Sequence, residues 1–367
     1  MQELFSGVYK DKTVLVTGHT GFKGSWLCFW LEKLGAKVVG YSLDVPTEPN
    51  HLELLGLNIV SLKGDIRDLE SLYEVFEEYE PDIVFHLAAQ ALVRQSYKSP
   101  IETYETNILG TLKVFEAAKA SNTKAIVNIT SDKAYENTES GYGYTEEDRL
   151  GGYDPYSSSK ACVEILTASY RNSYFNLEEY QNTHNTLVAS CRAGNVVGGG
   201  DWGYERLVPD IMLFASQNKK LSIRSPDSVR PWQHVLEPLS GYLQVGEKLL
   251  EEKVEFAQAW NFGPEEKESL SVENVVKMLQ EYWRNIDYKI DSSFDMPHEA
   301  KLLRLNCSKA YTLLKWRSVW DSETTFKKTV EWYKSFYDEK TKGICTEDDL
   351  KTYIVDAKKK GIEWTKS

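Results

Sequence analysis

A glycine-rich turn between a β-branched run and a helical pattern is the feature that most constrains the fold of this chain. The run Thr13–Val16 is followed by TGHTGFKG, whose Gly18, Gly21 and Gly24 precede a helical pattern that begins near Trp26. Glycines permit a tight strand-to-helix turn, and a helix N-terminus offers unpaired N–H groups and partial positive charge to a phosphate. The spacing is GxxGxxG rather than GxGxxG, so the order of strand, turn, helix and second strand carries the prediction of a dinucleotide site. The alternative is a glycine turn without a ligand.

Short β-branched runs alternate with helical stretches through the first half of the chain. The predicted strands are Thr13–Val16, Lys37–Tyr41, Asn58–Leu62, Ile83–Leu87, Ala125–Thr130 and Thr186–Arg192. The predicted helices between them include Trp26–Leu34, Leu69–Tyr79, Thr106–Lys119 and Tyr156–Tyr174. Right-handed crossovers convert this order into an α/β fold with an open, doubly wound parallel Rossmann sheet.

The alternation stops after Arg192 in the glycine-dense loop AGNVVGGGDWGYER. We expect a discontinuous Rossmann domain of residues 1–194 and 234–263. Residues 195–233 and 264–367 are expected to form a smaller, mostly α C-terminal substrate-binding domain. A chain of 367 residues has room for such a pair of domains.

Charge and composition exclude several classes of function. The formal net charge of −12 argues against nucleic-acid binding, which needs a basic surface. An anionic small molecule would need a local cluster of Arg or Lys. The five cysteines are scattered and the histidines lack metal-ligand spacing, so we expect reduced thiols, a cytoplasmic protein and no metal. We expect no membrane association, because no apolar run of about 18 residues occurs.

Two carboxylates extend the expected dinucleotide site beyond the glycine turn. Asp44 follows the second strand, where it can accept hydrogen bonds from an adenosine ribose; this favours NAD, since a 2′-phosphate would meet a carboxylate. Asp65 follows the third strand and is a candidate for the adenine edge, and a turn-forming role is the alternative for both. The full set expected to bind NAD is Gly18, Thr20, Gly21, Phe22, Lys23, Gly24, Asp44, Asp65, Ile66, Leu87, Ala88, Ala89, Thr130, Tyr156 and Lys160.

A tyrosine and a lysine four residues apart are the first catalytic candidates. Tyr156 and Lys160 share one face of a predicted helix, where the ammonium favours the phenolate. The YxxxK motif is common by chance, and its context makes it informative. Ser131, Asp132 and Lys133 follow the fifth strand, at the sheet edge where open α/β folds bind ligands. A surface ion pair is the alternative for Asp132 and Lys133.

Together the motifs TGxxGFxG, HLAAQ, SDKAY, DPYSSSK and RAGNVVGGGDW resemble the extended short-chain dehydrogenase/reductase family, and within it the dehydratases of CDP-glucose. The likeness covers nearly the whole chain. It implies bound NAD and the conversion of CDP-D-glucose to CDP-4-keto-6-deoxy-D-glucose, in deoxysugar biosynthesis of the O-antigen type. It also implies a homodimer or homotetramer that pairs helices across a two-fold axis.

The resemblance implies a role for each catalytic candidate. Tyr156 removes the proton of the C4 hydroxyl, helped by Ser131 and Lys160, while hydride passes to NAD and later returns to C6. Lys133 takes the C5 proton and Asp132 protonates the departing C6 hydroxyl. Related dTDP-glucose enzymes have Asp-Glu at this position, and a neighbouring Asp and Lys normally ionise, so the scheme requires burial to favour their neutral forms.

Substrate contacts are expected from Gln90, Asn195, Arg206, Arg230 and Arg304, because Arg donates two hydrogen bonds to phosphate at once. An ordinary surface role is the alternative for Arg206 and Arg304. Trp202 and Trp232 are candidates for stacking on the base or for core packing, and His86 is expected to be structural.

Two other functions remain open. A nucleotide-sugar 4-epimerase shares NAD, Tyr and Lys but has no use for an acid at C6, so Asp132–Lys133 disfavours it. A catalytically inert dinucleotide-sensing regulator is disfavoured by the retention of Ser131, Tyr156 and Lys160 together.

Overall fold

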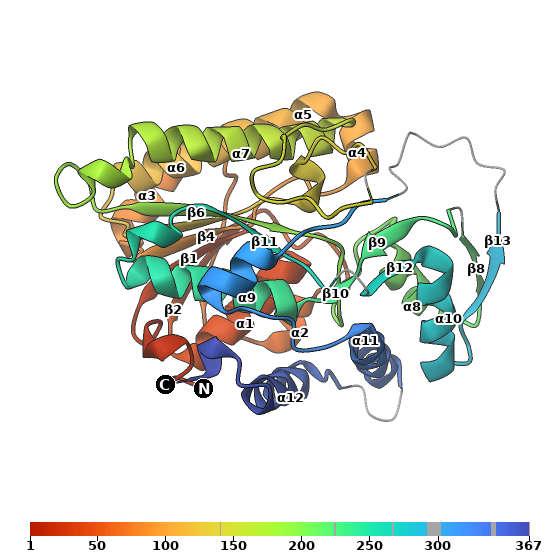
Figure 1. Cartoon of the computed structure of the whole chain (residues 1–367). Coiled ribbons are helices and arrows are strands. Elements are labelled where there is room, and N and C mark those ends of the chain that lie inside the picture. The colour runs from red at the N-terminus through yellow and green to blue at the C-terminus, as the bar shows by residue number, and fades with distance from the viewer. Residues whose placement is uncertain (140, 224, 266–267, 292–301, 339–342, 367) are drawn as a thin grey trace.

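A seven-stranded parallel sheet forms the centre of the protein in a computed structural model that describes residues 1–139, 141–223, 225–265, 268–291, 302–338 and 343–366 (Figure 1). The strand order is β11-β6-β5-β4-β1-β2-β3, and each neighbouring pair is parallel. The strands are β1 (Thr13–Thr17), β2 (Lys37–Ser42), β3 (Val60–Lys63), β4 (Ile83–His86), β5 (Ala125–Ile129), β6 (Leu187–Ala193) and β11 (Ala259–Phe262). The predicted Rossmann sheet is confirmed, with β11 added at its edge.

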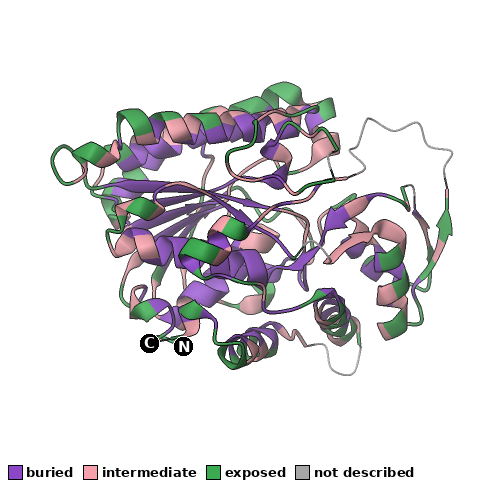
Figure 2. Cartoon of the chain, viewed as in Figure 1, coloured by how far each residue is buried: buried purple, intermediate pink, exposed green. Residues whose placement is uncertain are grey.

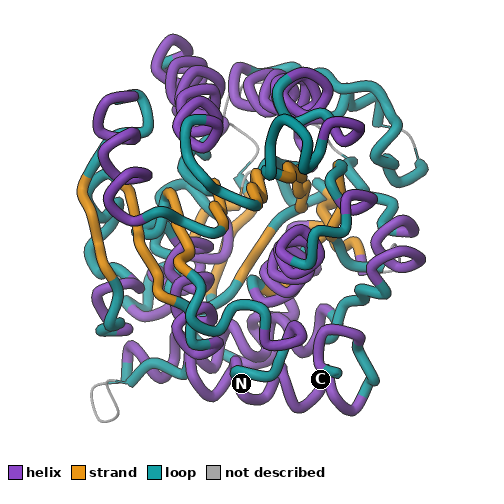
Figure 3. Tube along the Cα trace, turned by 90° about the vertical axis from the view of Figure 1, so that its left-hand side faces the viewer, coloured by secondary structure: helices purple, strands orange, loops and turns teal. Residues whose placement is uncertain are grey.

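Helices cover both faces of the sheet (Figures 1 and 3). One layer contains α3 (Leu69–Tyr79), α4 (Val93–Lys98), α5 (Pro100–Tyr104), η2 (Glu105–Gly110), α6 (Thr111–Lys119) and α7 (Pro155–Ser173). The other contains α1 (Phe22–Leu34), α2 (His51–Leu55) and α9 (Leu236–Leu250). Along β1, Val14 and Val16 enter one hydrophobic cluster and Leu15 enters the other. This double burial explains why the strands are continuously apolar in the sequence (Figure 2).

A smaller unit lies beyond the carboxyl ends of the strands. It contains α8 (Leu207–Ser216), α10 (Val272–Tyr282) and α11 (Ser322–Tyr337), which share a hydrophobic cluster of their own. Two small sheets accompany them: β8 (Lys220–Ile223) pairs with β13 (Asp287–Ile290), and β9 (Val229–Pro231) with β12 (Ser269–Ser271). The short strands β7 (Val196–Val197) and β10 (Gln233–His234) pair where the chain passes to and from this unit.

The C-terminal part of the chain packs on both units, whereas the predicted division assigned all of residues 264–367 to the smaller one. Residues of η7 (Ala310–Leu314), α12 (Thr346–Lys359) and η8 (Glu363–Thr365) belong to the hydrophobic cluster of the main sheet. Trp364 stacks on Phe5 of η1 (Phe5–Gly7) with ring centroids 5.1 Å apart, which brings the two termini together (Figure 1). Trp364 also packs against Trp30 of α1, so aromatic rings from the two ends of the chain cover the outer side of this helix. Local sequence pattern does not predict a contact between segments so far apart.

The remaining short helices are η3 (Asp132–Ala134), η4 (Leu177–Glu179) and η5 (Val254–Phe256). None of the helices in the described ranges combines the length and the apolar composition that crossing a bilayer requires.

Candidate active site

A cleft of about 840 Å³ opens at the carboxyl ends of the strands, between the main sheet and the smaller unit. It lies where strand order reverses, because β1 is flanked by β2 on one side and β4 on the other. All predicted site residues except Lys160 and Arg304 line it, namely Gly18, Thr20, Gly21, Phe22, Lys23, Gly24, Asp44, Asp65, Ile66, Leu87, Ala88, Ala89, Gln90, Thr130, Ser131, Asp132, Lys133, Tyr156, Asn195, Arg206 and Arg230.

The glycine turn leaves room that any side chain would fill. Gly18 has φ +76°, and a Cβ atom there would lie 2.7 Å from the backbone nitrogen of Ala88. A Cβ atom on Gly24 would lie 2.2 Å from the carbonyl oxygen of Gly18. Gly21 is the N-cap of α1 and brings no capping side chain, so the first turn of the helix keeps N–H groups for a ligand. The turn therefore fits the pyrophosphate of a dinucleotide.

The two predicted ribose and adenine carboxylates differ in their surroundings. Asp44 is exposed, and its Oδ2 lies 2.5 Å from Nζ of Lys63. Asp65 accepts hydrogen bonds from Nε and Nη2 of Arg67, at 3.0 and 2.6 Å, and this pairing lowers the pKa of Asp65. Arg67 also lines the cleft and was missed by the sequence analysis. Its position two residues after a strand-end carboxylate is the signal that could have identified it.

Ser131 caps the short helix η3, which contains Asp132 and Lys133 and follows β5. The Ser131 hydroxyl donates to Oδ1 of Asp132 at 3.1 Å and accepts from the backbone N–H of Lys133 at 3.2 Å. Asp132 is buried, and its Oδ2 has no hydrogen-bond partner within the described ranges. Burial raises the pKa of Asp132, although the charges of Lys133 and Arg230 oppose that rise. The carboxyl group is therefore suited to hold a proton and donate it.

The start of α7 fixes Tyr156 at the cleft. Asp154 is the N-cap and accepts from the backbone N–H and the hydroxyl of Ser157 at 2.9 and 2.6 Å, and Pro155 occupies the first turn. Burial raises the pKa of the Tyr156 phenol to about 12, and a hydrogen bond with Ser131 acts in the opposite direction. The phenol and the η3 turn thus face the same space.

Lys160 lies one helical turn behind Tyr156 and forms part of the support of the cleft wall. Its ammonium donates to the carbonyl oxygen of Ile129 at 3.3 Å. Burial and the nearby charge of Lys23 together lower the pKa of Lys160 to about 7, although the charge of Glu164 acts in the opposite direction. A small change in the surrounding charge therefore decides whether Lys160 is protonated near neutral pH.

Positive charge in the smaller unit converges on the same cleft. Arg206 precedes α8, and its guanidinium contacts Oδ2 of Asp201 at 3.0 Å, which raises the pKa of Arg206. Arg230 is buried on β9 and carries a charge that acts on Asp132. Arg304 lies instead beside the carbonyl oxygen of Gly141, 3.5 Å from its Nη1, and away from the cleft lining.

An ion pair that the sequence analysis missed lies in the lining of the cleft. Nη1 of Arg94, on α4, lies 3.6 Å from Oε1 of Glu205, which precedes α8, and both residues line the cleft. The position of Arg94 shortly after HLAAQ, at the ligand-binding edge of the sheet, is the only sequence signal for it.

Several candidates are engaged within the protein. The Gln90 side chain donates to Leu92 O and Thr103 Oγ1 at 3.1 and 2.9 Å. Trp202 packs in the hydrophobic cluster of the smaller unit and donates to Tyr337, while Trp232 is buried but also lines the cleft. His86 lies 2.7 and 2.9 Å from the hydroxyls of two threonines, and burial lowers its pKa to about 3, as expected for a structural histidine.

Comparisons with known proteins agree with this geometry. A family model described as GDP-mannose 4,6 dehydratase matches residues 15–330. A CDP-glucose 4,6-dehydratase from Salmonella typhimurium is 47% identical over 94% of this chain and 97% of that protein. Among solved structures, an epimerase from Methanothermobacter thermautotrophicus has a TM-score of 0.77 at 26% identity, covering 90% of this chain and 94% of that one.

The fold is also shared with a dTDP-glucose 4,6-dehydratase from Bacillus anthracis, solved in complex with NAD, at a TM-score of 0.71 and 24% identity over 88% of this chain and 96% of that one. The resemblance inferred from the motifs is confirmed by the family match and by the extent of the relative's identity. The chain therefore belongs to the GDP-mannose 4,6 dehydratase family.

Proposed function

We propose that the protein is an NAD-dependent hydro-lyase that converts CDP-D-glucose to CDP-4-keto-6-deoxy-D-glucose. The observation that carries this proposal is the convergence of Ser131, Asp132, Lys133 and Tyr156 on one cleft beside the glycine turn. An acid and an amine next to a buried phenol suit an oxidation at C4 followed by loss of water across C5 and C6. The relative that is 47% identical over almost its whole length bears the name of this activity.

The residues of the Rossmann wall fit NAD. The turn of Gly18, Gly21 and Gly24 would hold the pyrophosphate, and Asp44 would accept hydrogen bonds from the adenosine ribose. Bound NAD would supply a reversible hydride acceptor, which makes the overall dehydration redox-neutral. Because the reaction needs no second redox substrate, we expect the cofactor to stay bound through the cycle.

Tyr156 would serve as the base for the C4 hydroxyl. Burial keeps its phenol protonated in the free protein, so a nearby positive charge is required to favour the phenolate. Lys160, one turn along α7, provides that charge when it is protonated. Ser131, which contacts the phenol, would orient the reacting hydroxyl.

The η3 turn would perform the elimination. A C4 ketone makes the C5 proton acidic, so that Lys133 can remove it as a base while Asp132 protonates the departing C6 hydroxyl. The burial of Asp132 and its unpartnered Oδ2 within the described ranges support the role of a protonated acid. A 4-epimerase has no use for such an acid, and this residue therefore favours the dehydratase.

The nucleotide part of the substrate would lie along the smaller unit. Arg206 and Arg230 are the cationic groups that line that wall, and their guanidinium planes suit the diphosphate. Asn195 and Gln90 would contribute polar contacts, although the Gln90 amide would have to exchange its internal partners. Residues 1–194 with 234–263 and residues 195–233 with 264–367 would form the two domains that enclose the substrate.

The direct test is to incubate the purified protein with CDP-, dTDP-, UDP- and GDP-glucose and to follow the alkali-induced absorbance of the keto sugar. The proposal expects keto-sugar formation that is fastest with CDP-glucose. Conversion to a galactose epimer without keto product would establish the 4-epimerase. Binding of NAD without turnover of any nucleotide sugar would establish the regulator.

We also propose that the protein forms a homodimer or homotetramer through η2, α6 and α7, together with the neighbouring α5. Exposed apolar side chains occur on these elements, where Ile101, Leu109 and Ile165 are 74%, 47% and 57% exposed. Replacing Ile165 with Glu should shift the sedimenting species to the monomer. The five unpaired cysteines suit a cytoplasmic enzyme of deoxysugar biosynthesis for O-antigen, and this setting is part of the proposal.

A further inference from the structure

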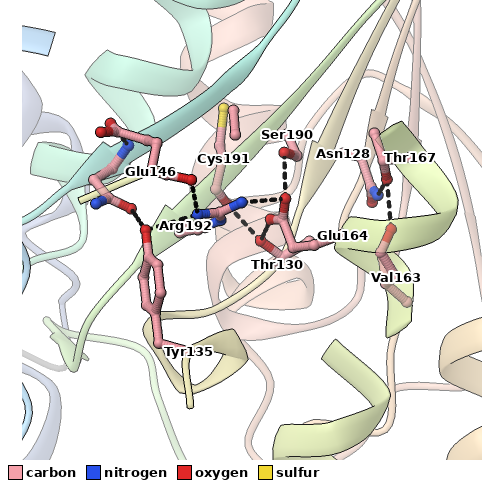
Figure 4. A network of polar contacts seen from close by, with 12 residues as sticks. Asn128, Thr130, Tyr135, Glu146, Val163, Glu164, Thr167, Ser190, Cys191 and Arg192 are labelled. Atoms are coloured by element: carbon pink, nitrogen blue, oxygen red, sulfur yellow. Dashed lines mark hydrogen bonds and ion pairs between the residues drawn. The ribbon is translucent and has the colours of Figure 1, made fainter. Parts of the chain in front are cut away.

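A buried ion pair joins β6 to α7, and its carboxylate also binds the residue before the η3 turn, so it connects the two segments that carry the catalytic candidates (Figure 4). Glu164 on α7 and Arg192 on β6 contact each other at 2.9 Å, and their side chains are 2% and 4% exposed. Two hydroxyl groups also donate to the Glu164 carboxylate, and one of them is that of Ser190, which donates to Oε2 at 2.7 Å. Thr130, the residue before Ser131, donates its hydroxyl to Oε1 of Glu164.

The residues that form this network lie next to catalytic candidates in the sequence. Glu164 follows Lys160 by one helical turn on α7, and Thr130 connects β5 to the η3 turn of Ser131 and Asp132. Nη1 of Arg192 also donates to the Tyr135 hydroxyl at 2.7 Å, just past η3. The Glu164 carboxylate thus links α7, which carries Tyr156, to the residue before the η3 turn, which carries Asp132.

The charge of Glu164 is maintained in spite of its burial. Burial by itself would raise the pKa of Glu164, but the charge of Arg192 and the hydrogen bonds from Arg192, Thr130 and Ser190 lower it. Salt bridges of this kind rarely add stability relative to apolar residues of the same shape. The presence of such a pair beside the helix of Tyr156 and Lys160 therefore points to a role other than stability alone.

Lys160 is surrounded by groups of both signs. Lys23 on α1 disfavours its ammonium, Glu164 on α7 favours it, and Tyr156 and Asp132 face the same region from α7 and η3. His86 on β4 is kept neutral by burial and feels the charge of Lys160. Glu164 is the anion among them that stays ionised in the free protein.

We propose that Glu164 and Arg192 are positioning residues for the reaction: their buried pair fixes α7 against the η3 turn, and the Glu164 carboxylate keeps Lys160 protonated so that Tyr156 can act as a base. This inference rests on the roles given to Tyr156 and Lys160 in the proposed function. It adds two residues that touch neither substrate nor cofactor and act through Thr130 and Lys160.

The test separates charge from geometry. Glu164→Gln removes the charge and keeps the length of the side chain, so Lys160 loses its proton at lower pH. Activity that depends on the ammonium falls as pH rises through the pKa of Lys160, and we expect this fall to move down by about one pH unit, which is about a tenfold loss of kcat on the alkaline side. Glu164→Asp keeps the charge and shortens the side chain, so kcat should fall at every pH without moving the alkaline limb.

The double variant Glu164→Gln/Arg192→Gln removes both buried charges. Because this variant also lacks the Glu164 carboxylate, its alkaline limb should stay displaced as in Glu164→Gln, although it no longer leaves a buried guanidinium without its carboxylate partner. Asp349→Asn is the matched control: Asp349 forms another buried pair, 3.2 Å from Lys328, but lies on α12 away from the cleft lining. It should change thermal stability and leave the pH limb in place.

A second readout needs no sugar. The pH dependence of NAD affinity, followed by tryptophan quenching, should show the same displacement in Glu164→Gln. The inference would be overturned if the wild-type enzyme is active and Glu164→Gln shifts neither the alkaline limb of kcat nor the pH dependence of NAD affinity. It would also be overturned if Asp349→Asn shifts them as far as Glu164→Gln does. Displaced NAD binding in a protein that makes no keto sugar would leave the inference standing and remove the proposed function.

Discussion

The two walls of the cleft are built in different ways. The Rossmann wall presents groups at the ends of β1, β4 and β5 and at the start of α1 and α7, where a regular backbone fixes their positions. The wall of the smaller unit presents Arg206 from a loop before α8 and Arg230 from a three-residue strand. The first wall is suited to chemistry, which needs fixed geometry, and the second to binding a flexible diphosphate. The predictions below test this division, from the largest expected effect to the smallest.

Tyr156→Phe should cause the largest loss. The variant keeps the ring packed at the start of α7 and removes only the hydroxyl proposed to take the C4 proton, so kcat should fall by about a hundredfold to ten-thousandfold. Keto-sugar formation measures the loss, and thermal denaturation should show a stability close to that of the wild type. Full activity in this variant would show that the phenol takes no part in the mechanism. It would also contradict the assignment of the chemistry to the Rossmann wall.

Gly24→Ala should weaken NAD binding. The added Cβ atom would lie 2.2 Å from the Gly18 carbonyl oxygen, so the turn must shift to accommodate it. Overpacking of this kind costs about 1–3 kcal/mol, which corresponds to a rise in the Kd for NAD of about 5- to 150-fold. The matched control is Gly141→Ala, because a Cβ atom at Gly141 meets nothing within 4 Å. Equal affinity in the two variants would contradict the phosphate-cradle interpretation.

Arg206→Ala should raise the KM for the nucleotide sugar more than it lowers kcat. Hydrogen bonds to a charged group contribute about 1.5–3 kcal/mol, so a rise of about 10- to 100-fold is expected. Arg304→Ala is the informative comparison, because the structure places Arg304 outside the cleft lining and predicts a KM within about twofold of the wild type. A large rise in KM for Arg304→Ala would instead support the substrate contact of Arg304 that the sequence analysis expects.

The smallest expected effect concerns the seam between α9 and the C-terminal segment. Burial raises the pKa of Glu237 to about 7, although its carboxylate accepts from Val319 N, Trp320 N and the Tyr353 hydroxyl. The folded protein therefore binds this proton more tightly than the unfolded chain, and the contribution of Glu237 to stability falls as pH rises from about 4.5 to about 7.

Thermal denaturation of the wild type and of Glu237→Gln across this pH range provides the measurement. The variant should be less stable at low pH and should show a flatter dependence on pH. A slope identical to that of the wild type would mean that Glu237 does not titrate in this range.

The sequence by itself determined the Rossmann sheet, the glycine turn and the shared helical face of Tyr156 and Lys160. These features depend on local spacing: apolar runs that alternate with helical periodicity, glycines at a strand end, and two residues four apart on a helix. The catalytic candidates at the end of β5 follow from the same logic, since the carboxyl ends of parallel strands share one edge of the sheet.

Only the tertiary structure decided how the cleft is closed and supported. Arg206 and Arg304 look equivalent in the sequence, and the Arg94–Glu205 pair in the cleft lining has almost no local signal. The Glu164–Arg192 pair joins residues 28 positions apart, and the C-terminal aromatic rings cover a helix from the start of the chain. The physical reason is that side-chain pairing and burial depend on which distant segments meet, whereas backbone periodicity depends on neighbours along the chain.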